Sequence, residues 1–272
     1  MQRREFLAAS AAAAAGIAAA GGAAGAGAAE PAGSKQLVEL RTYHFASPQK
    51  RQAFERFMAS AAVPALNRAG VKPVGVFSFR PEDNPELKPG VVDSNDLFVL
   101  LPHETPESLL TLDRRLLADE AFLKAGRGVV DSPKSDPAYS RYETSLLLGF
   151  AQCPRVEVPT TAPGRLVQLR IYESHNEERA KKKVHMFDEG GEIALFRRLG
   201  MHPVFFGEAL AGPRMPNLTY ILAFDNAAKR DAAWNAFRGD PQWKKLSGDE
   251  AYKDTVSNIT NLVLRPADGS QV

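Results

Sequence analysis

The chain has 272 residues, which is enough for one large domain or two domains of ordinary size. Apolar residues make up 44% and charged residues 24%, the composition of a folded soluble protein. The formal net charge of +2 and the lack of a long basic run argue against a nucleic-acid partner. The single cysteine, Cys153, excludes an internal disulfide and a thiolate-rich metal site, and we interpret it as a loop or partly buried thiol rather than a nucleophile.

Residues 1–29 have the pattern of an export signal. The pair Arg3-Arg4 precedes an Ala/Gly-rich run from Ala8 to Ala29, which resembles the twin-arginine signal of bacteria. The glycines in the second half of this run make a membrane-spanning helix the weaker alternative, and Ala26-Gly27-Ala28 offers a cleavage site. We therefore predict a periplasmic or otherwise exported protein with no stable membrane span after signal removal. Twin-arginine export permits a cofactor but does not require one.

A seven-residue pattern occurs twice and organises the rest of the chain. Leu37–Tyr43 reads LVELRTY, and 129 residues later Leu166–Tyr172 reads LVQLRIY. Both segments alternate apolar and polar side chains, which is the period of a strand with two unlike faces. We therefore predict one structural unit that is used twice, each time opening on a strand with an Arg and a Tyr on its polar face.

The first predicted unit spans residues 37–150. Ser47-Pro48 supplies the N-cap and first residue of a helix that Pro64 should kink and Gly70 should end. A second helix starts at Thr105, and a long polar connection then leads to the last strand. The other predicted strands are residues 73–79, 97–101 and 142–150, with a loop at residues 80–95.

Residues 151–164 contain three prolines and are the predicted linker. The second unit, residues 165–266, repeats the order of the first. Its first helix carries Gly190-Gly191, where we expect a break or bulge, and its second helix begins at Asp225 or Asn226. The other features of this unit are strands at 204–206, 218–224 and 257–264, a turn at 240–243 and a loose tail after 266.

The order strand, helix, strand, strand, helix, strand is ferredoxin-like. Both helices then cover one face of a four-stranded sheet, and the two sheets can close against each other through their uncovered faces. The predicted fold class is α+β, with two tandem ferredoxin-like units forming an intrachain dimeric α+β barrel. We expect Arg41 and Arg170 to face the enclosed interior, which is the predicted pocket.

The repeated strand, the Gly70…Pro73 pair, the Asp240-Pro241-Gln242-Trp243 segment and the doubled unit resemble the NIPSNAP family of the dimeric α+β barrel superfamily. The resemblance covers residues 37–150 and 165–265. It implies the barrel fold, and the family brings no established reaction with it. Gln168 departs from the family pattern, because an acidic residue, Glu39, stands at the same place in the first unit.

The residues that we select first as ligand-binding are Arg41 and Arg170, oriented by Tyr43 and Tyr172. A guanidinium on a central strand is costly to bury unless it meets an acid or an anionic ligand. The functional interpretation is therefore recognition of a carboxylate or phosphate. The structural alternative is an ion pair of Arg41 with Glu39 or Glu143, and such strand pairs are common.

None of the five histidines lies in a metal-binding pattern, so no metal site is predicted. His44 and His175 directly follow the two repeated strands, and either could act as a base or a haem ligand. A surface or loop histidine is the alternative for each. The acidic residues are scattered, and no pair is placed for acid–base catalysis.

Three functions stay open on the sequence alone. The first is a carrier that binds a small molecule in the barrel interior, with anions among the candidate ligands. The second is an enzyme of the barrel superfamily, either a cofactor-free oxygenase or isomerase or a haem-linked enzyme, and the cofactor is therefore unknown. The third is a protein-interaction module. Association of two chains through exposed strand edges is also open.

Overall fold

A computed structural model describes residues 34–88 and 90–272, so the predicted export signal lies outside the described residues. The first unit follows the expected order, with one helix more than predicted. Its elements are β1 (Leu37–His44), α1 (Pro48–Phe57), a π-helix (Met58–Ala62), α2 (Val63–Arg68), β2 (Gly75–Phe79), a 3-10 turn (Pro81–Asp83), β3 (Leu97–His103), α3 (Pro106–Leu117), α4 (Glu120–Val130) and β4 (Arg141–Gly149).

The second unit repeats this plan and ends in a strand that closes the sheet. Its elements are β5 (Leu166–Glu173), α5 (Glu177–Phe187), α6 (Glu192–Arg198), β6 (His202–Ala211), β7 (Asn217–Phe224), α7 (Ala227–Gly239), α8 (Pro241–Ser247), a 3-10 turn (Glu250–Tyr252) and β8 (Asn258–Pro266). The predicted interruption is present, because α5 and α6 are separated by a turn in which Gly191 has a φ of 91°.

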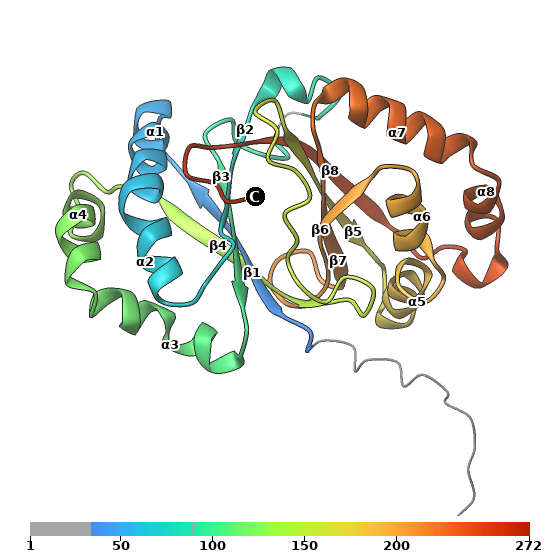
Figure 1. Ribbon diagram of the computed structural model, residues 1–272, viewed down its shortest axis with the longest axis horizontal. Helices are drawn as coiled ribbons and strands as arrows, with labels where there is room; N and C mark the ends of the chain where they lie inside the picture. Colours follow the sequence, from blue (N-terminus) through green and yellow to red (C-terminus); the bar gives the residue numbers. More distant parts are fainter. Residues whose placement is uncertain (1–33, 89) are drawn as a thin grey trace, which may run out of the picture. The chain divides into compact units, whose positions relative to one another are not determined.

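The eight strands form one closed antiparallel barrel in the order β1-β3-β2-β8-β5-β7-β6-β4 (Figure 1). Each unit therefore contributes a four-stranded sheet, and the sheets join where β2 pairs with β8 and β4 pairs with β6. The predicted α+β barrel is confirmed. Each of these described strands has two neighbours, but β4 pairs with β6 only over Leu146–Gly149 and β8 pairs with β2 only over Leu264–Pro266. The association of two chains that the sequence left open stays a prediction.

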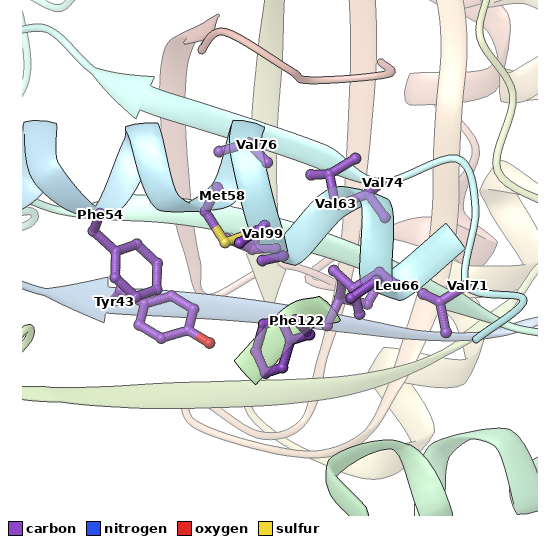
Figure 2. Packing of buried hydrophobic residues seen from close by; sticks show 14 of the residues in the cluster. Tyr43, Phe54, Met58, Val63, Leu66, Val71, Val74, Val76, Val99 and Phe122 are labelled. Carbon is purple, nitrogen blue, oxygen red and sulfur yellow. The ribbon is translucent and has the colours of Figure 1, made fainter. Parts of the chain in front are cut away.

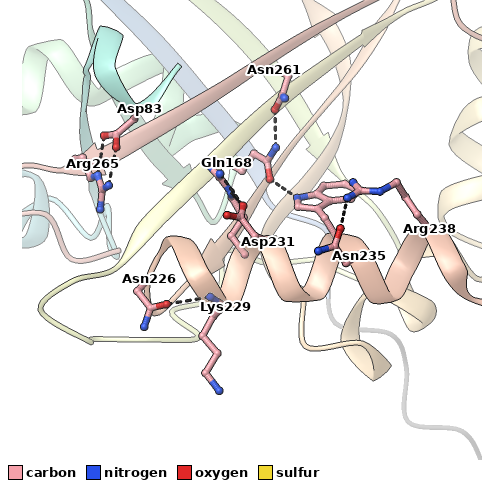
Figure 3. A network of polar contacts seen from close by, with 11 residues as sticks. Asp83, Gln168, Asn226, Lys229, Asp231, Asn235, Arg238, Asn261 and Arg265 are labelled. Atoms are coloured by element: carbon pink, nitrogen blue, oxygen red, sulfur yellow. Dashed lines mark hydrogen bonds and ion pairs between the residues drawn. The ribbon is translucent and has the colours of Figure 1, made fainter. Parts of the chain in front are cut away.

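Side chains from the loop after β2 strengthen one of the two junctions. The guanidinium of Arg265 on β8 donates to both carboxylate oxygens of Asp83 at 2.7 and 2.8 Å (Figure 3). The side chain of Asn84 exchanges two hydrogen bonds of 2.8 Å with the backbone of Val263. The contact with Arg265 lowers the pKa of Asp83. The loop thus attaches the first unit to the last strand of the second.

The starts of three helices could be predicted from the sequence, because a short polar side chain caps each of them. The side chains of Ser47, Thr105 and Asn226 accept backbone N–H groups at the starts of α1, α3 and α7. Pro64 interrupts the regular α-helix: the turn before it widens into the π-helix, because a proline supplies no N–H and its ring crowds the carbonyl four residues earlier.

Three predictions about local structure were wrong. Residues 120–130 form α4 rather than a polar connection, since Asp119 accepts the N–H of Phe122 and is a start signal, not an end signal. Residues 241–247 form the short helix α8, not only a turn. The tail after Pro266 is not loose: Ala267 donates its backbone N–H to Val76 of β2, Gln271 donates to Val74 just before β2, and Val272 is buried.

Three apolar clusters make up the core, and they decide which face of β1 is inside the barrel. Val38 and Leu40 belong to the cluster that fills the barrel, whereas Tyr43 packs with the helices of the first unit. Arg41 shares the face of Tyr43, because side chains alternate along a strand. The prediction that Arg41 and Arg170 look into one shared interior is therefore wrong. Alternation reveals two faces, but only packing decides which one the helices cover.

No helix among residues 34–88 and 90–272 combines the length and the apolar character needed to cross a bilayer.

Candidate functional site

A cavity of about 290 Å³ lies between the sheet and the helices of the first unit. Arg41 and Tyr43 on β1 are part of its wall, and Leu117 and Tyr142, both more than one-third exposed, also line it. Its other lining residues are Phe54, Phe57, Met58, Ala62, Leu66, Val99, Leu101, Asp113, Leu116, Phe122, Val129, Val130 and Tyr139. The wall is thus mainly apolar and aromatic, with a few polar groups.

Arg41 is held by its neighbour on the same face of β1. Its Nε and Nη2 donate to the two carboxylate oxygens of Glu39 at 2.7 and 2.9 Å, and Thr144 donates to the same carboxylate at 2.9 Å. The ion pair with Glu39 that we considered from the sequence is therefore present, and Glu143 is not the partner of Arg41. Because Glu39 offsets the charge of Arg41, this wall suits a polar oxygen better than a full negative charge.

The two titratable groups beside Arg41 respond to burial in different ways. Burial raises the pKa of Glu39, but the contacts with His103 and Arg41 outweigh it and bring the pKa down to about 2. Burial raises the pKa of Tyr43, so that its hydroxyl stays protonated at neutral pH. Nη1 of Arg41 lies 3.4 Å from this hydroxyl, which is a long contact. Hydrogen-bond donors on Arg41 and Tyr43 therefore remain available to a ligand.

Aromatic rings form the rest of this polar end. Tyr43 lies 4.7 Å from Phe54 and 5.1 Å from Tyr142 between ring centroids, and Tyr139 meets it edge-on at 5.2 Å. Figure 2 shows Tyr43 and Phe54 in contact beneath the first helix. Met58 and Ala62 of the π-helix also line the cavity. A π-helix is rare and is frequently found at functional sites, so this irregular turn marks the same place.

The second unit has large side chains where the first has small ones. Arg41 lies opposite Val99, and Val99 lies opposite Val76 on the next strand. At the corresponding places in the second unit, Arg170 lies opposite Tyr220 and Tyr220 lies opposite Phe206. Tyr220 and Phe206 are fully buried and stack at 4.7 Å. Two valines are thus replaced by two aromatic rings, which fill the corresponding space.

Arg170 contacts aromatic faces instead of a carboxylate, and among the described residues its buried Nε has no hydrogen-bond partner. Its guanidinium lies 4.8 Å from the ring of Trp234 and 5.2 Å from that of Tyr172. Gln168, which replaces the acid of the first unit, accepts the indole N–H of Trp234 at 2.6 Å and donates to Asn261 at 2.7 Å (Figure 3). Arg170 and Tyr172 are therefore parts of a packed core.

A buried charge pair lies near Arg170. The ammonium of Lys183 is 3.4 Å from the carboxylate of Glu192, and both side chains are at most 7% exposed. Burial lowers the pKa of Lys183 and raises that of Glu192. Lys183 occupies the same helix position as Phe54, which stands 129 residues earlier in the first unit. Where Phe54 lines the cavity of the first unit, the second unit therefore has a buried charge pair.

The two candidate histidines lie elsewhere. His44 lines a smaller cavity of about 100 Å³ at one end of the barrel interior, where its Nδ1 contacts the carboxylate of Asp96 at 2.8 Å. His175 is exposed in the turn before α5. The structure thus divides the selected residues among four places: Arg41 and Tyr43 at the large cavity with Glu39 bound to Arg41, His44 at the small cavity, Arg170 and Tyr172 in the second core, and His175 at the surface.

Sequence reasoning missed Tyr139, Tyr142 and Val99 as parts of the candidate site. Tyr139 and Tyr142 stand on either side of the start of β4, and their aromatic character was the available signal. Val99 gave no signal by itself, since only comparison with Tyr220 in the second unit reveals its importance.

The large cavity does not fit a haem held by histidine. No histidine is among the side chains that line the large cavity, and its volume is small for a macrocycle. Within the described ranges, no three His, Cys, Asp or Glu side chains gather as metal ligands. Burial raises the pKa of Cys153 to about 12, so that this thiol is a poor nucleophile.

Comparison with known proteins supports the fold and part of the family resemblance. A monooxygenase-like protein from Lactobacillus acidophilus NCFM matches with a TM-score of 0.56 and 12% identity, and the match covers 87% of this chain and 98% of that protein. A second monooxygenase-like protein, from Fusobacterium nucleatum, matches over 86% and 93% with a TM-score of 0.54 and 6% identity. An anthrone oxidase-like protein matches over 89% and 97%, with a TM-score of 0.50 and 13% identity.

These identities are low, so the likeness shows the barrel fold alone. A search of the curated proteins gave no match. The family model of NIPSNAP matches residues 167–271. The match covers the second unit, and for the first unit the same resemblance stays a prediction. The likeness to NIPSNAP is thus shown over residues 167–271 of a chain whose described strands close into an α+β barrel.

Proposed function

We propose that this chain binds a small ring-containing molecule in the cavity of the first unit, with an oxygen of that molecule at Arg41 and Tyr43. A volume of about 290 Å³ is near the lower end of ligand cavities, and apolar walls with a few polar groups are typical of them. The flat aromatic side chains favour a flat ligand. This differs from the anionic ligand that the sequence suggested, because Glu39 already neutralises Arg41.

The observation that carries the proposal is the difference between the two units. The replacement of Val76 and Val99 by Phe206 and Tyr220 shows that the fold accommodates a filled core at this place. The cavity in the first unit is therefore not a requirement of the barrel. An unfilled apolar space costs stability, so its presence supports a role in binding.

The test is to fill the cavity with the residue found in the second unit. The change Val99→Tyr should weaken the binding of 1-naphthol, used as a bicyclic phenol probe, at least tenfold, because the new ring occupies the ligand space. Fluorescence titration of the purified protein measures the dissociation constant. The control is Val158→Tyr, the same change at an exposed linker position. A folded Val99→Tyr variant with unchanged naphthol affinity would refute the proposal.

The second candidate function is enzymatic: the cavity would convert the molecule that it binds. Arg41 and the Tyr43 hydroxyl would donate hydrogen bonds to the reacting oxygen of the ligand. The names of the monooxygenase-like neighbours point in the same direction. The reaction to test is the oxidation of a dihydroxynaphthalene to its quinone, in which O₂ takes two electrons and two protons and leaves as hydrogen peroxide. Oxygen uptake that Val99→Tyr does not reduce would exclude this cavity as its site.

We also propose that the chain is exported by the twin-arginine route, on the basis of Arg3-Arg4 and the Ala/Gly-rich run that follows. In a bacterial host, replacing both arginines by lysine should leave the protein in the cytoplasm, while the natural sequence reaches the periplasm. Cell fractionation followed by immunoblotting measures the distribution. Export of the double-lysine variant at the natural level would contradict the proposal.

A further inference from the structure

The smaller cavity, at the end of the barrel interior, has a built polar rim and an apolar floor. Its volume is about 100 Å³, well above the roughly 10–15 Å³ that one water requires. Leu40, Leu169 and Leu262 line it from strands of both units. Asn217, Thr219 and Thr260 also line it, and each is at most 5% exposed. A ligand here would need an apolar part and a polar part.

Arg214 is fixed at this rim by an unusual backbone. It lies between β6 and β7 with a φ of 63°, a conformation that is uncommon for a residue with a side chain. The side-chain amide of Asn217 holds this turn by donating to the backbone oxygens of Pro213 and Arg214 at 3.2 and 3.1 Å. Nη1 of Arg214 then donates to the Thr260 hydroxyl on β8 at 2.7 Å. The turn thus places a guanidinium at the cavity.

Of the charged side chains that line the cavity, the two acids have other partners, and Arg214 has no carboxylate partner among the described residues. Asp96 is paired with His44 at 2.8 Å, and Glu143 lies 3.6 Å from Arg141 and 3.7 Å from His44. Both acids thus have partners on the first unit. Among the residues that the structure describes, no carboxylate lies within 4.0 Å of Arg214. A guanidinium with free donors beside threonine hydroxyls is suited to a carboxylate.

We propose that this cavity binds a short aliphatic carboxylate, with its carboxylate at Arg214 and Thr260 and its alkyl part on the leucine floor. The site differs from the one proposed for the ring-containing ligand and does not depend on it. The sequence analysis predicted that Arg41 and Arg170 bind an anion in the barrel interior. In the present proposal an anion binds there, but Arg214 is the arginine that binds it. Both units contribute to it, so it exists only when the barrel is closed.

The test uses propionate and its neutral analogue propionamide on the isotopically labelled full chain. Propionate should shift the amide NMR signals of Asn217, Thr219 and Thr260, and propionamide should bind at least tenfold more weakly. Arg214→Gln should raise the dissociation constant for propionate at least tenfold, without added backbone strain, because both residues carry a Cβ. The matched control, Arg238→Gln, removes an exposed arginine of α7 that lines neither cavity and should change the constant less than twofold.

Three results would overturn the proposal: propionate leaves the three amide signals in place, propionamide binds equally well, or folded Arg214→Gln binds propionate like the natural chain. Tighter binding of inorganic phosphate than of propionate would also overturn it, because the leucine floor would then have no function. Titration of Arg214→Gln with 1-naphthol separates the two sites. Unchanged naphthol affinity shows that the fold and the first-unit cavity are intact.

Discussion

The pair formed by Glu39 and Arg41 shows how one residue determines what a site can bind. The carboxylate accepts hydrogen bonds from Arg41 and Thr144 and lies 3.7 Å from Nε2 of His103, and only 6% of its side chain is exposed. Buried ion pairs contribute little net stability, but removal of one partner leaves an uncompensated charge. We therefore regard Glu39 as the residue that orients Arg41 for a ligand.

The pH dependence of stability should report this pair. The pKa of Glu39 falls from 4.5 to about 2 on folding, so its contribution is present above pH 4.5 and is lost as the pH falls toward 2. The shift corresponds to at most about 3 kcal/mol of unfolding free energy at neutral pH. Glu39→Gln should therefore be clearly less stable than the natural chain at pH 7, and the difference should shrink between pH 4.5 and 2.

Urea unfolding at a series of pH values measures this difference. The control is Glu143→Gln, at a half-exposed carboxylate on the neighbouring strand, which should change the unfolding free energy by less than about 0.5 kcal/mol. A constant difference between Glu39→Gln and the natural chain from pH 7 to pH 2 would contradict the assignment.

At the scale of the element, α4 (Glu120–Val130) is the part of the first unit that sequence patterns did not predict. It packs against the π-helix, and its Phe122, Val129 and Val130 line the cavity. Two glycines, Gly126 and Gly128, lie within it and lower its helix propensity. Their environments differ, which makes them a matched pair.

The change Gly128→Ala should stabilise the chain by about 0.5–1 kcal/mol, because a Cβ there meets nothing within 4 Å and alanine favours the helix. At Gly126 an added Cβ would lie 2.6 Å from Cε2 of Phe57, so Gly126→Ala should gain less or lose stability, and should alter naphthol binding, because Phe57 lines the cavity. Thermal unfolding and the naphthol titration measure both effects. Equal gains in stability from the two variants would show that α4 does not press on Phe57.

Sequence reasoning predicted the elements whose signals are local. The repeated strand, the caps at Ser47 and Asn226 and the Gly190-Gly191 break each depend on a few adjacent residues, and the structure confirms them. The face of β1 that points into the barrel could not be predicted, because both faces are buried. One face packs in the barrel interior, and the opposite face packs against the helices of the first unit. The cavity could not be predicted either, because it depends on Val99 being small at the place where the second unit has Tyr220.

At the scale of the whole molecule, the residues after β8 return to the first unit. The backbone N–H groups of Ala267 and Gln271 donate hydrogen bonds of 2.8 Å to the backbone oxygens of Val76 and Val74, which belong to the first unit. Val272 is 2% exposed and packs with the barrel cluster. This segment and the junction of β2 with β8 therefore hold the same side of the barrel closed (Figure 1).

Removal of residues 267–272 should lower the unfolding free energy by at least about 3 kcal/mol, from the lost burial of one valine and from several lost hydrogen bonds. The milder change Val272→Ala should cost about 1–2 kcal/mol, because it removes only two methyl groups. Urea unfolding measures both. A truncated chain as stable as the natural one would mean that the segment contributes nothing to closure.

The joining of two unlike units in one chain has a further consequence. When a barrel of this kind is assembled from two identical chains, every substitution occurs twice, and a change that closes one cavity closes the other. Here the unit with Tyr220 and Phe206 can be packed for stability, while the unit with Val99 and Val76 keeps its cavity. Covalent linkage thus allows one copy to supply rigidity and leaves the other free to change its binding specificity.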